Sequence, residues 1–207
     1  MTESDRVLKF VKGEFVYVNV EGQASWQKSA AIHTFNSNLY LLADKGNEIL
    51  RHRPSVGGFS SKVVITNPDG LVLNPILDFT IENGFYAIRS NLTVDKLFTT
   101  PTVSRQGLIL NKLPDNYRVG DGVIPRIIAS TTSSFIYVLL DGNIWIFEPD
   151  SRNFKDVRSL KYIGQIEVSG AKVLSLIIEK DGEIMALTSN GLSQIKFEVA
   201  DSKIRLR

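Results

Sequence analysis

The strongest pattern in the chain is Phe135–Phe147, in which two short apolar runs flank a tight polar turn. The runs are Phe-Ile-Tyr-Val-Leu-Leu and Ile-Trp-Ile-Phe, and the turn between them is Asp-Gly-Asn. β-Branched, aromatic and aliphatic residues on both sides of an Asp-Gly pair are the strongest short-range signal for a β-hairpin. Because the same arrangement recurs along the chain, the pattern predicts a series of β-meanders.

The recurring unit has the order strand, tight turn, strand, tight turn, strand and outer strand. Tyr40, Tyr86, Tyr137 and Met185 occupy equivalent places in the second strand, at separations of 46, 51 and 48 residues (86−40, 137−86 and 185−137). Periods of roughly 40 to 50 residues with four strands each are typical of β-propeller blades. An irregular β-sandwich has turns at similar intervals and is the alternative. The fixed order of the two turns favours the propeller.

The predicted fold is therefore all-β, a β-propeller of four-stranded antiparallel blades with about four full blades and an N-terminal hairpin. The units cover approximately residues 6–25 (partial), 26–70, 71–122, 123–170 and 171–207. Helix is limited to isolated turns, because no segment sustains a 3.6-residue apolar period over three turns. The hairpin at Arg6–Val20 leaves open sheet edges, which predict either a longer parent chain or self-association.

The hairpins at Ile136–Phe147 and Leu39–Leu50 resemble those of NHL-like and YVTN-like β-propeller repeat proteins. The resemblance covers roughly residues 26–200 and extends especially to the propeller regions that trail bacterial signalling proteins, some with PP2C-type phosphatase domains. It implies a propeller fold and a noncatalytic interaction role, with no catalytic set to place on this chain. Such propellers usually have five to seven blades, so the four and a half units found here depart from the family pattern.

The composition of the chain argues against nucleic-acid binding, thiolate metal sites and membrane insertion. Lys+Arg at 24 against Asp+Glu at 22 gives a formal charge of +2, so no basic field for nucleic acid is expected. The absence of cysteine excludes disulfides and thiolate metal sites. Residues 1–6 carry acids where a signal peptide would carry bases, and no apolar run of 18 or more residues follows. We expect no membrane insertion in this segment; the compartment stays open, with the cytoplasm as the default.

The sequence offers little catalytic or metal-binding chemistry. His33 lies in an apolar first strand and is expected to be a satisfied interior residue, whereas His52 lies between Arg51 and Arg53, a setting that disfavours a bound cation. Histidine-based metal centres normally need two or three imidazoles with convergent carboxylates. No Gly-x-Ser-x-Gly nucleophile elbow occurs. We therefore predict no catalytic residues, no metal and no cofactor.

Candidate binding residues come from turns and from the longest loops, Asn67–Asn74 and Asn111–Pro125. The turn residues recur at one end of each unit and would gather on one face of a propeller, although tight turns alone explain Asp and Asn there. The long-loop residues are of types that contribute strongly at interfaces. The candidate set is Asp44, Asn91, Tyr117, Arg118, Asp141 and Asn190.

The leading hypothesis is a noncatalytic module that binds a protein partner, or another domain of its parent chain, through this loop face. One alternative is a propeller-type lyase or hydrolase that uses the central channel. It is disfavoured because first strands such as Ala30–Phe35 and Val173–Ile178 are mostly apolar. The other alternative is a carbohydrate-binding module, for which Trp26, Tyr117 and Trp145 would have to be exposed.

Overall fold

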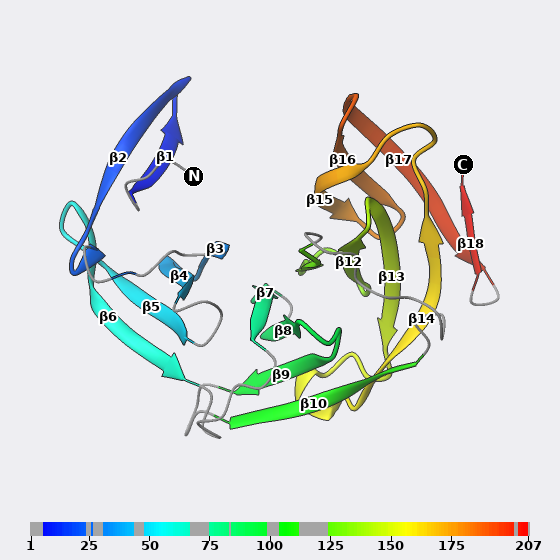
Figure 1. Cartoon of the computed structure of the whole chain (residues 1–207), viewed down its shortest axis with the longest axis horizontal. Coiled ribbons are helices and arrows are strands. Elements are labelled where there is room, and N and C mark those ends of the chain that lie inside the picture. Colours follow the sequence, from blue (N-terminus) through cyan, green and yellow to red (C-terminus); the bar gives the residue numbers. More distant parts are fainter. Residues whose placement is uncertain are drawn as a thin grey trace.

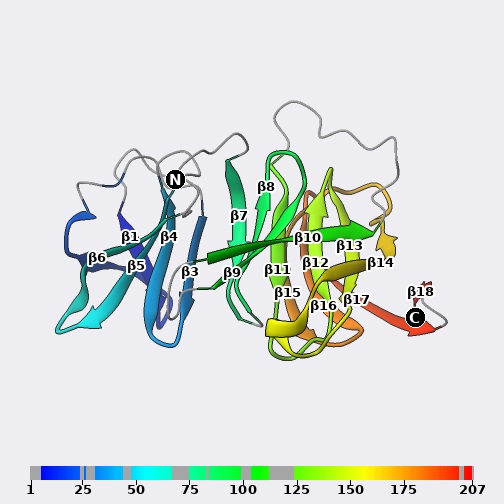
Figure 2. The ribbon, with the colours of Figure 1, turned by 90° about the horizontal axis from the view of Figure 1, so that it is seen from below.

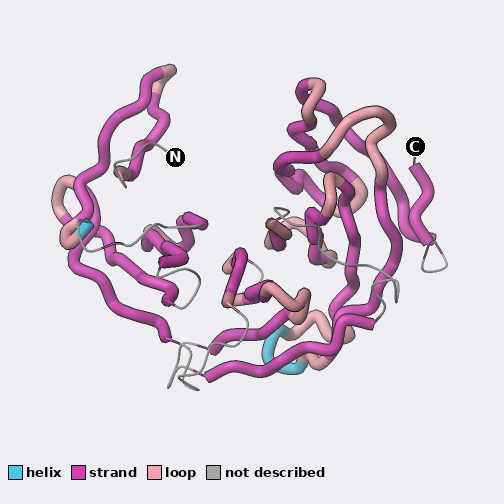
Figure 3. Tube along the Cα trace, viewed as in Figure 1, coloured by secondary structure: helices cyan, strands magenta, loops and turns pink. Residues whose placement is uncertain are grey.

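The computed structural model describes residues 6–23, 26, 31–43, 48–66, 75–82, 84–98, 104–111, 124–200 and 203–206. Strands are the main element of this part of the chain (Figure 3), and a short 3-10 turn, η3 (Phe154–Asp156), connects two of them. Within these residues, no helix combines the length and the hydrophobicity that crossing a membrane requires. The predicted all-β class is confirmed.

The strands form three hydrogen-bonded sheets. The first has the order β1-β2-β6-β5-β4-β3 and consists of β1 (Val7–Val11), β2 (Glu14–Val20), β3 (Ala31–Phe35), β4 (Asn38–Ala43), β5 (Glu48–Ser55) and β6 (Gly58–Thr66). The second has the order β11-β12-β13-β14-β10-β9-β8-β7 and consists of β7 (Ile76–Thr80), β8 (Tyr86–Arg89), β9 (Val94–Phe98), β10 (Ser104–Asn111), β11 (Arg126–Ala129), β12 (Ile136–Leu140), β13 (Asn143–Pro149) and β14 (Ser159–Ile166). The third has the order β15-β16-β17-β18 and consists of β15 (Val173–Lys180), β16 (Glu183–Thr188), β17 (Gly191–Ala200) and β18 (Lys203–Leu206).

These strands divide into four antiparallel meanders, which we call blade 1 (β3–β6), blade 2 (β7–β10), blade 3 (β11–β14) and blade 4 (β15–β18). The blades follow one another around an arc, with β3, β7, β11 and β15 toward the centre and the last strands of the blades outside (Figures 1 and 2). The β1–β2 hairpin precedes blade 1, and the arc is open between this hairpin and blade 4 (Figure 1). The prediction of a β-propeller with four four-stranded blades and an N-terminal hairpin is confirmed, and the propeller is open.

The core lies between consecutive units rather than within one of them. On β12, Tyr137 and Leu139 pack toward blade 4, whereas Ile136 and Val138 pack toward blade 2. Both faces of the strand are thus buried, which explains why β12 is apolar along its whole length without alternation. Burial of such side chains contributes about 1.5–3 kcal/mol each, so the stacking of blades supplies most of the stabilisation.

The hairpin that joins β12 to β13 has the predicted tight turn. Asp141 has φ 53° and Gly142 has φ 77°. Two successive residues with positive φ define the mirror-image turn that matches the right-handed twist of the flanking strands. Asp and Gly occupy these places because they tolerate the left-handed region better than other residues do.

Two outer strands make parallel pairs across units, which no local sequence pattern predicted. β2 pairs with β6 at Asn19 and Gly58, and β10 pairs with β14. At the first of these pairs the backbones approach so closely that a Cβ atom on Gly58 would lie 2.0 Å from the carbonyl oxygen of Asn19. Glycine at this position therefore allows the N-terminal hairpin to extend the sheet of blade 1.

A buried lysine connects blade 2 to blade 3. Lys96 on β9 is fully buried, and its Nζ donates to the backbone carbonyls of Phe154 (2.9 Å), Lys155 (3.0 Å) and Val157 (2.8 Å). Burial lowers the pKa of Lys96 from its usual value, and Arg158 acts in the same direction. The ammonium form still matches its site, because it has three donors for three carbonyl acceptors. The side chain thereby holds the η3 turn of one blade against the neighbouring blade.

Candidate functional site

The inner strands of three successive blades bring polar side chains together at the centre of the arc. His33 comes from β3, Asp78 from β7 and Arg126 from β11. Nε of Arg126 lies 3.5 Å from Oδ2 of Asp78, and Nε2 of His33 lies 3.9 Å from Oδ1 of the same carboxylate. Sequence reasoning singled out only His33 here, since the other two are separated by 48 residues (126−78) and no motif connects them.

Asp78 is held in place by hydrogen bonding to the backbone edge of β11 that faces blade 2. In the described sheet, β11 pairs with β12 on one side only. Side chains of β7 satisfy its other edge: Asp78 Oδ2 accepts from the Ile127 N–H at 2.9 Å, and Thr80 Oγ1 accepts from the Ala129 N–H at 3.2 Å. These bonds compensate the buried backbone donors, so one oxygen of Asp78 has a structural role. The second oxygen remains available.

A cavity of about 280 Å³ lies against this group, with His33, Asp78, Glu82 and Arg126 among its lining residues. We call it the channel cavity. The Asp78 side chain is 2% exposed, and its Oδ1 has no hydrogen-bond partner within the described part of the chain. Such a group can accept a hydrogen bond from a bound ligand. The arrangement can thus hold and orient a small molecule that carries a donor.

The expectation that His33 is a satisfied interior residue is wrong. Its side chain is 30% exposed and lines two cavities, and its ring is tilted against the ring of Phe79 at a centroid distance of 4.6 Å. His52 is instead the buried histidine. It lies on β5 between blade 1 and the N-terminal hairpin, where Ser60 and Trp26 are its hydrogen-bond partners.

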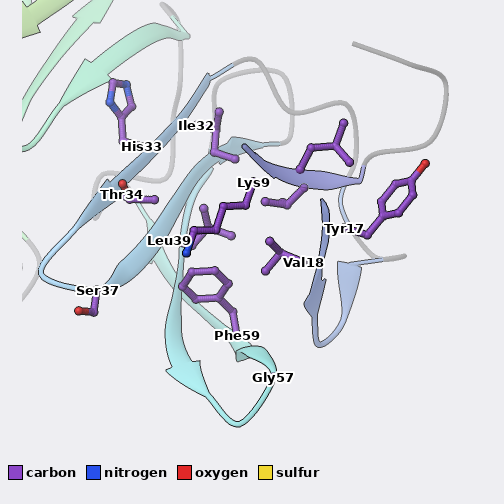
Figure 4. A pocket seen from close by; sticks show the side chains of 13 residues that line it. Lys9, Tyr17, Val18, Ile32, His33, Thr34, Ser37, Leu39, Gly57 and Phe59 are labelled. Carbon is purple, nitrogen blue, oxygen red and sulfur yellow. The ribbon is translucent and has the colours of Figure 1, made fainter. Parts of the chain in front are cut away.

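The second cavity lined by His33 is a groove of about 750 Å³ between the N-terminal hairpin and blade 1, which we call the hairpin groove. Its walls are mainly apolar side chains from β1, β2, β3, β4 and β6, and Lys9 supplies a cation (Figure 4). The apolar residues at its centre include Val18, Ile32, Leu39 and Phe59. In the described sheet, β1 lies at the end of the strand order, so its outer backbone edge has no neighbouring strand. Val7, Leu8 and Lys9 of the same strand line the groove.

Three of the predicted binding residues are described by the structure, and all three occupy the turn between the second and third strands of a blade. Asn91 accepts hydrogen bonds from the backbone N–H and hydroxyl of Thr93, and Asn190 donates to the Gly170 carbonyl at 3.1 Å. Asp141 has positive φ. Each residue thus has a local structural role, and a binding role remains a prediction. The other three, Asp44, Tyr117 and Arg118, lie outside the described residues.

Two aromatic residues that the carbohydrate-binding hypothesis required on the surface are buried. Trp26 packs between the hairpin and blade 1, and Trp145 packs between blades 2 and 3. Indole rings in these positions contribute to the core and offer no stacking platform for a sugar. Tyr117, the third residue of that hypothesis, lies outside the described part of the chain.

No protein-family model matches the chain, and no curated protein matches it either. Solved structures do match. They include a candidate 6-phosphogluconolactonase from Bacteroides uniformis, with TM-score 0.60, 13% identity and coverage of 100% of this chain and 65% of that one. YCF48 from Cyanidioschyzon merolae matches with TM-score 0.55, 10% identity and coverage of 99% and 67%. Hsv2 from Kluyveromyces lactis matches with TM-score 0.56, 14% identity and coverage of 98% and 67%.

These likenesses concern the fold. At 13% identity or similar values the shared feature is the stacking of blades, and site residues do not transfer. The chain spans 65% of the candidate 6-phosphogluconolactonase and 67% of YCF48 and Hsv2. YCF48 has also been solved bound to D1 peptide, and that structure matches this chain with TM-score 0.52 and 9% identity.

Proposed function

We propose that this protein is a noncatalytic β-propeller interaction module that binds an extended segment of another protein in the hairpin groove. The observation that carries the proposal is the combination of an apolar groove of about 750 Å³ with the open edge of β1 beside it. An open strand edge offers backbone donors and acceptors, and adjacent apolar pockets receive alternate side chains of an added strand. We therefore favour the hairpin groove, in place of the loop face, as the binding surface.

The groove also indicates the chemistry of its partner. Lys9 is the charged residue that accompanies the apolar lining, and its side chain is exposed. A segment with alternating apolar side chains and one carboxylate placed to pair with Lys9 would complement both properties. The peptide complex of YCF48 supports a propeller of this shape as a peptide-binding scaffold, although it provides no residue-level correspondence.

A peptide selection tests the proposal and reveals the sequence preference of the groove in the same experiment. The probe is a displayed library of random decapeptides selected on the full chain. We expect enriched peptides that alternate apolar and polar residues and carry an acid. Binding of these peptides should protect the backbone amides of Val7–Val11 from hydrogen exchange, because the added strand pairs with β1.

Two substitutions and a matched control locate the site. Ile32 is 51% exposed in the groove, so Ile32→Glu should leave the fold intact and weaken peptide binding by roughly tenfold or more, since a carboxylate enters an apolar pocket. Lys9→Glu should change the selected peptides from acidic to basic. Leu192→Glu alters another exposed apolar residue, on blade 4, and should have no effect. The proposal fails if the peptides bind all three variants like the unchanged protein, or if β1 gains no protection.

A further inference from the structure

We propose that the channel cavity binds a small organic cation, a primary ammonium on a short aliphatic chain, with Oδ1 of Asp78 as its principal acceptor. This goes beyond the groove function, because neither Asp78 nor the neighbouring carboxylate Glu82 lines the hairpin groove. The site is built from residues of blades 1 to 4. The inner strands of those blades lie toward the centre of the arc (Figure 1).

The first observation is the available oxygen of Asp78. Oδ2 is satisfied by the Ile127 N–H at 2.9 Å and approached by Arg126, whereas Oδ1 is buried and has no hydrogen-bond partner among the residues that the structure describes. Buried carboxylate oxygens are normally hydrogen-bonded, and an unsatisfied one is costly. A ligand that donates a hydrogen bond to Oδ1 removes this cost. His33 does not remove it, since its Nε2 lies 3.9 Å away.

The second observation is the balance of charge. Among the residues that line the channel cavity, Asp78 and Glu82 carry carboxylates and Arg126 carries the guanidinium. Arg126 is 47% exposed and its Nε already approaches the Asp78 carboxylate. The two carboxylates outnumber the one guanidinium, so these three side chains together carry one negative charge in excess. An ammonium group is attracted to such a site, and a carboxylate is repelled.

The third observation is the size and character of the remaining lining. The cavity volume of about 280 Å³ lies just below the range of roughly 300–1,000 Å³ that ligand pockets usually have. Buried aliphatic side chains of Leu139, Leu176 and Ile178 form part of its wall. A short hydrocarbon chain fits these surfaces. Metal ions need four or more ligand atoms, so one buried oxygen beside apolar walls suits an ammonium with an aliphatic body better.

Three probes of similar size separate the effect of charge from that of shape. Butylammonium, butanol and butyrate each have four carbon atoms and carry a positive, a neutral and a negative head group. Binding is followed by calorimetry and by the NMR shift of the Ile127 amide, which reports on the Asp78 carboxylate through its hydrogen bond. We expect butylammonium to bind roughly tenfold or more tightly than butanol, because a charged donor strengthens the bond to a carboxylate. Butyrate should not bind.

Neutralising an acidic and a basic residue of the cavity should change the affinity for butylammonium in opposite directions. Glu82→Gln should weaken butylammonium binding roughly threefold, and Arg126→Gln should strengthen it roughly threefold, as expected for exposed charges near the ligand. Asp78→Asn should abolish binding. Glu148→Gln removes an exposed carboxylate on β13 outside the cavity and should change nothing. If Asp78→Asn proves unstable, Glu82→Gln and Arg126→Gln still test the proposal. Melting curves of these two variants show whether each retains its fold.

Two results would overturn the proposal. One is preferential binding of butyrate that is lost in Arg126→Gln, which would identify an anion site. The other is the absence of any shift of the Ile127 amide with all three probes at millimolar concentration, which would show that the available oxygen of Asp78 recruits no ligand.

Discussion

Trp26 donates a hydrogen bond from its indole Nε1 to Nε2 of His52 over 3.2 Å, and both side chains are buried between the N-terminal hairpin and blade 1. Because an indole nitrogen can only donate, Nε2 must be the acceptor nitrogen. The proton of the neutral imidazole therefore resides on Nδ1, which donates to the Ser60 carbonyl at 2.8 Å. The geometry fixes both the tautomer and the neutral state of this histidine.

Stability should fall in mildly acidic solution because of His52. Burial lowers the pKa of His52 from 6.5, with Lys62 acting in the same direction and the Ser60 carbonyl opposing it. A lowered folded-state pKa means that the unfolded chain binds the proton first as the pH falls. The contribution of His52 is therefore fully present above about pH 6.5 and is lost as the pH falls from there through the folded-state pKa.

The measurement is the free energy of unfolding by urea at a series of pH values from about 7.5 to about 4.5, which spans the ordinary histidine pKa. Its slope in the acid limb should be reduced in His52→Gln and retained in His33→Gln, since only the former removes the buried imidazole. An identical slope in both variants would assign the acid sensitivity to other groups.

Lys96 should be a major stabilising residue although it is charged. Lys96→Met keeps the volume of the side chain but leaves the carbonyls of Phe154, Lys155 and Val157 without its donors, so we expect a loss of about 3 kcal/mol in the free energy of unfolding. Lys155→Met, at an exposed position in the same turn, should cost less than about 0.5 kcal/mol. Chemical denaturation of both variants measures the difference. Equal small losses would show that the three bonds contribute little net stability.

The parallel pair between the hairpin and blade 1 should depend on Gly58. In Gly58→Ala the new Cβ meets the Asn19 carbonyl oxygen at 2.0 Å, so the two backbones must separate, at a cost of about 2 kcal/mol. Gly57→Ala is the control, because its Cβ would meet nothing within 4 Å and only its positive φ of 80° adds strain, about 1 kcal/mol. Hydrogen exchange at the Glu21 amide, which donates to the Phe59 carbonyl at 3.0 Å, reports the separation. If this amide exchanges equally slowly in both variants, the pairing tolerates the methyl group.

Removal of residues 1–24 should destabilise the remaining blades and promote association. Val7 and Val20 of the hairpin are buried against Leu39 and Leu41 of β4, and loss of their burial corresponds to about 4 kcal/mol. The truncation also uncovers the apolar face of blade 1. Melting curves and light scattering of the shortened and full chains measure both effects. A shortened chain that stays monomeric with an unchanged melting temperature would contradict this account of the N-terminus.

The sequence predicted the features that depend on neighbours along the chain. The hairpin at Phe135–Phe147 was recognisable because its turn residues and both apolar strands are contiguous. The polar residues of the channel cavity were not recognisable, because Asp78 and Arg126 meet only through the stacking of two blades. The burial of His52 was not predicted for a related reason: on β5, alternation places Arg51 on one face and His52 on the other, so its charged sequence neighbours do not share its environment.

The stacking of the blades has a direction. Tyr40 packs toward blade 2, Tyr86 toward blade 3 and Tyr137 toward blade 4, where equivalent second strands receive them. The corresponding face of blade 4 carries Met185 and the exposed Leu187. Contacts of this kind join unlike surfaces, and repeated unlike contacts either close into a ring or continue as a filament. A molecule that covers the Leu187 face in the same manner must present the surface of a following blade, so two copies related by a two-fold axis do not reproduce the contact.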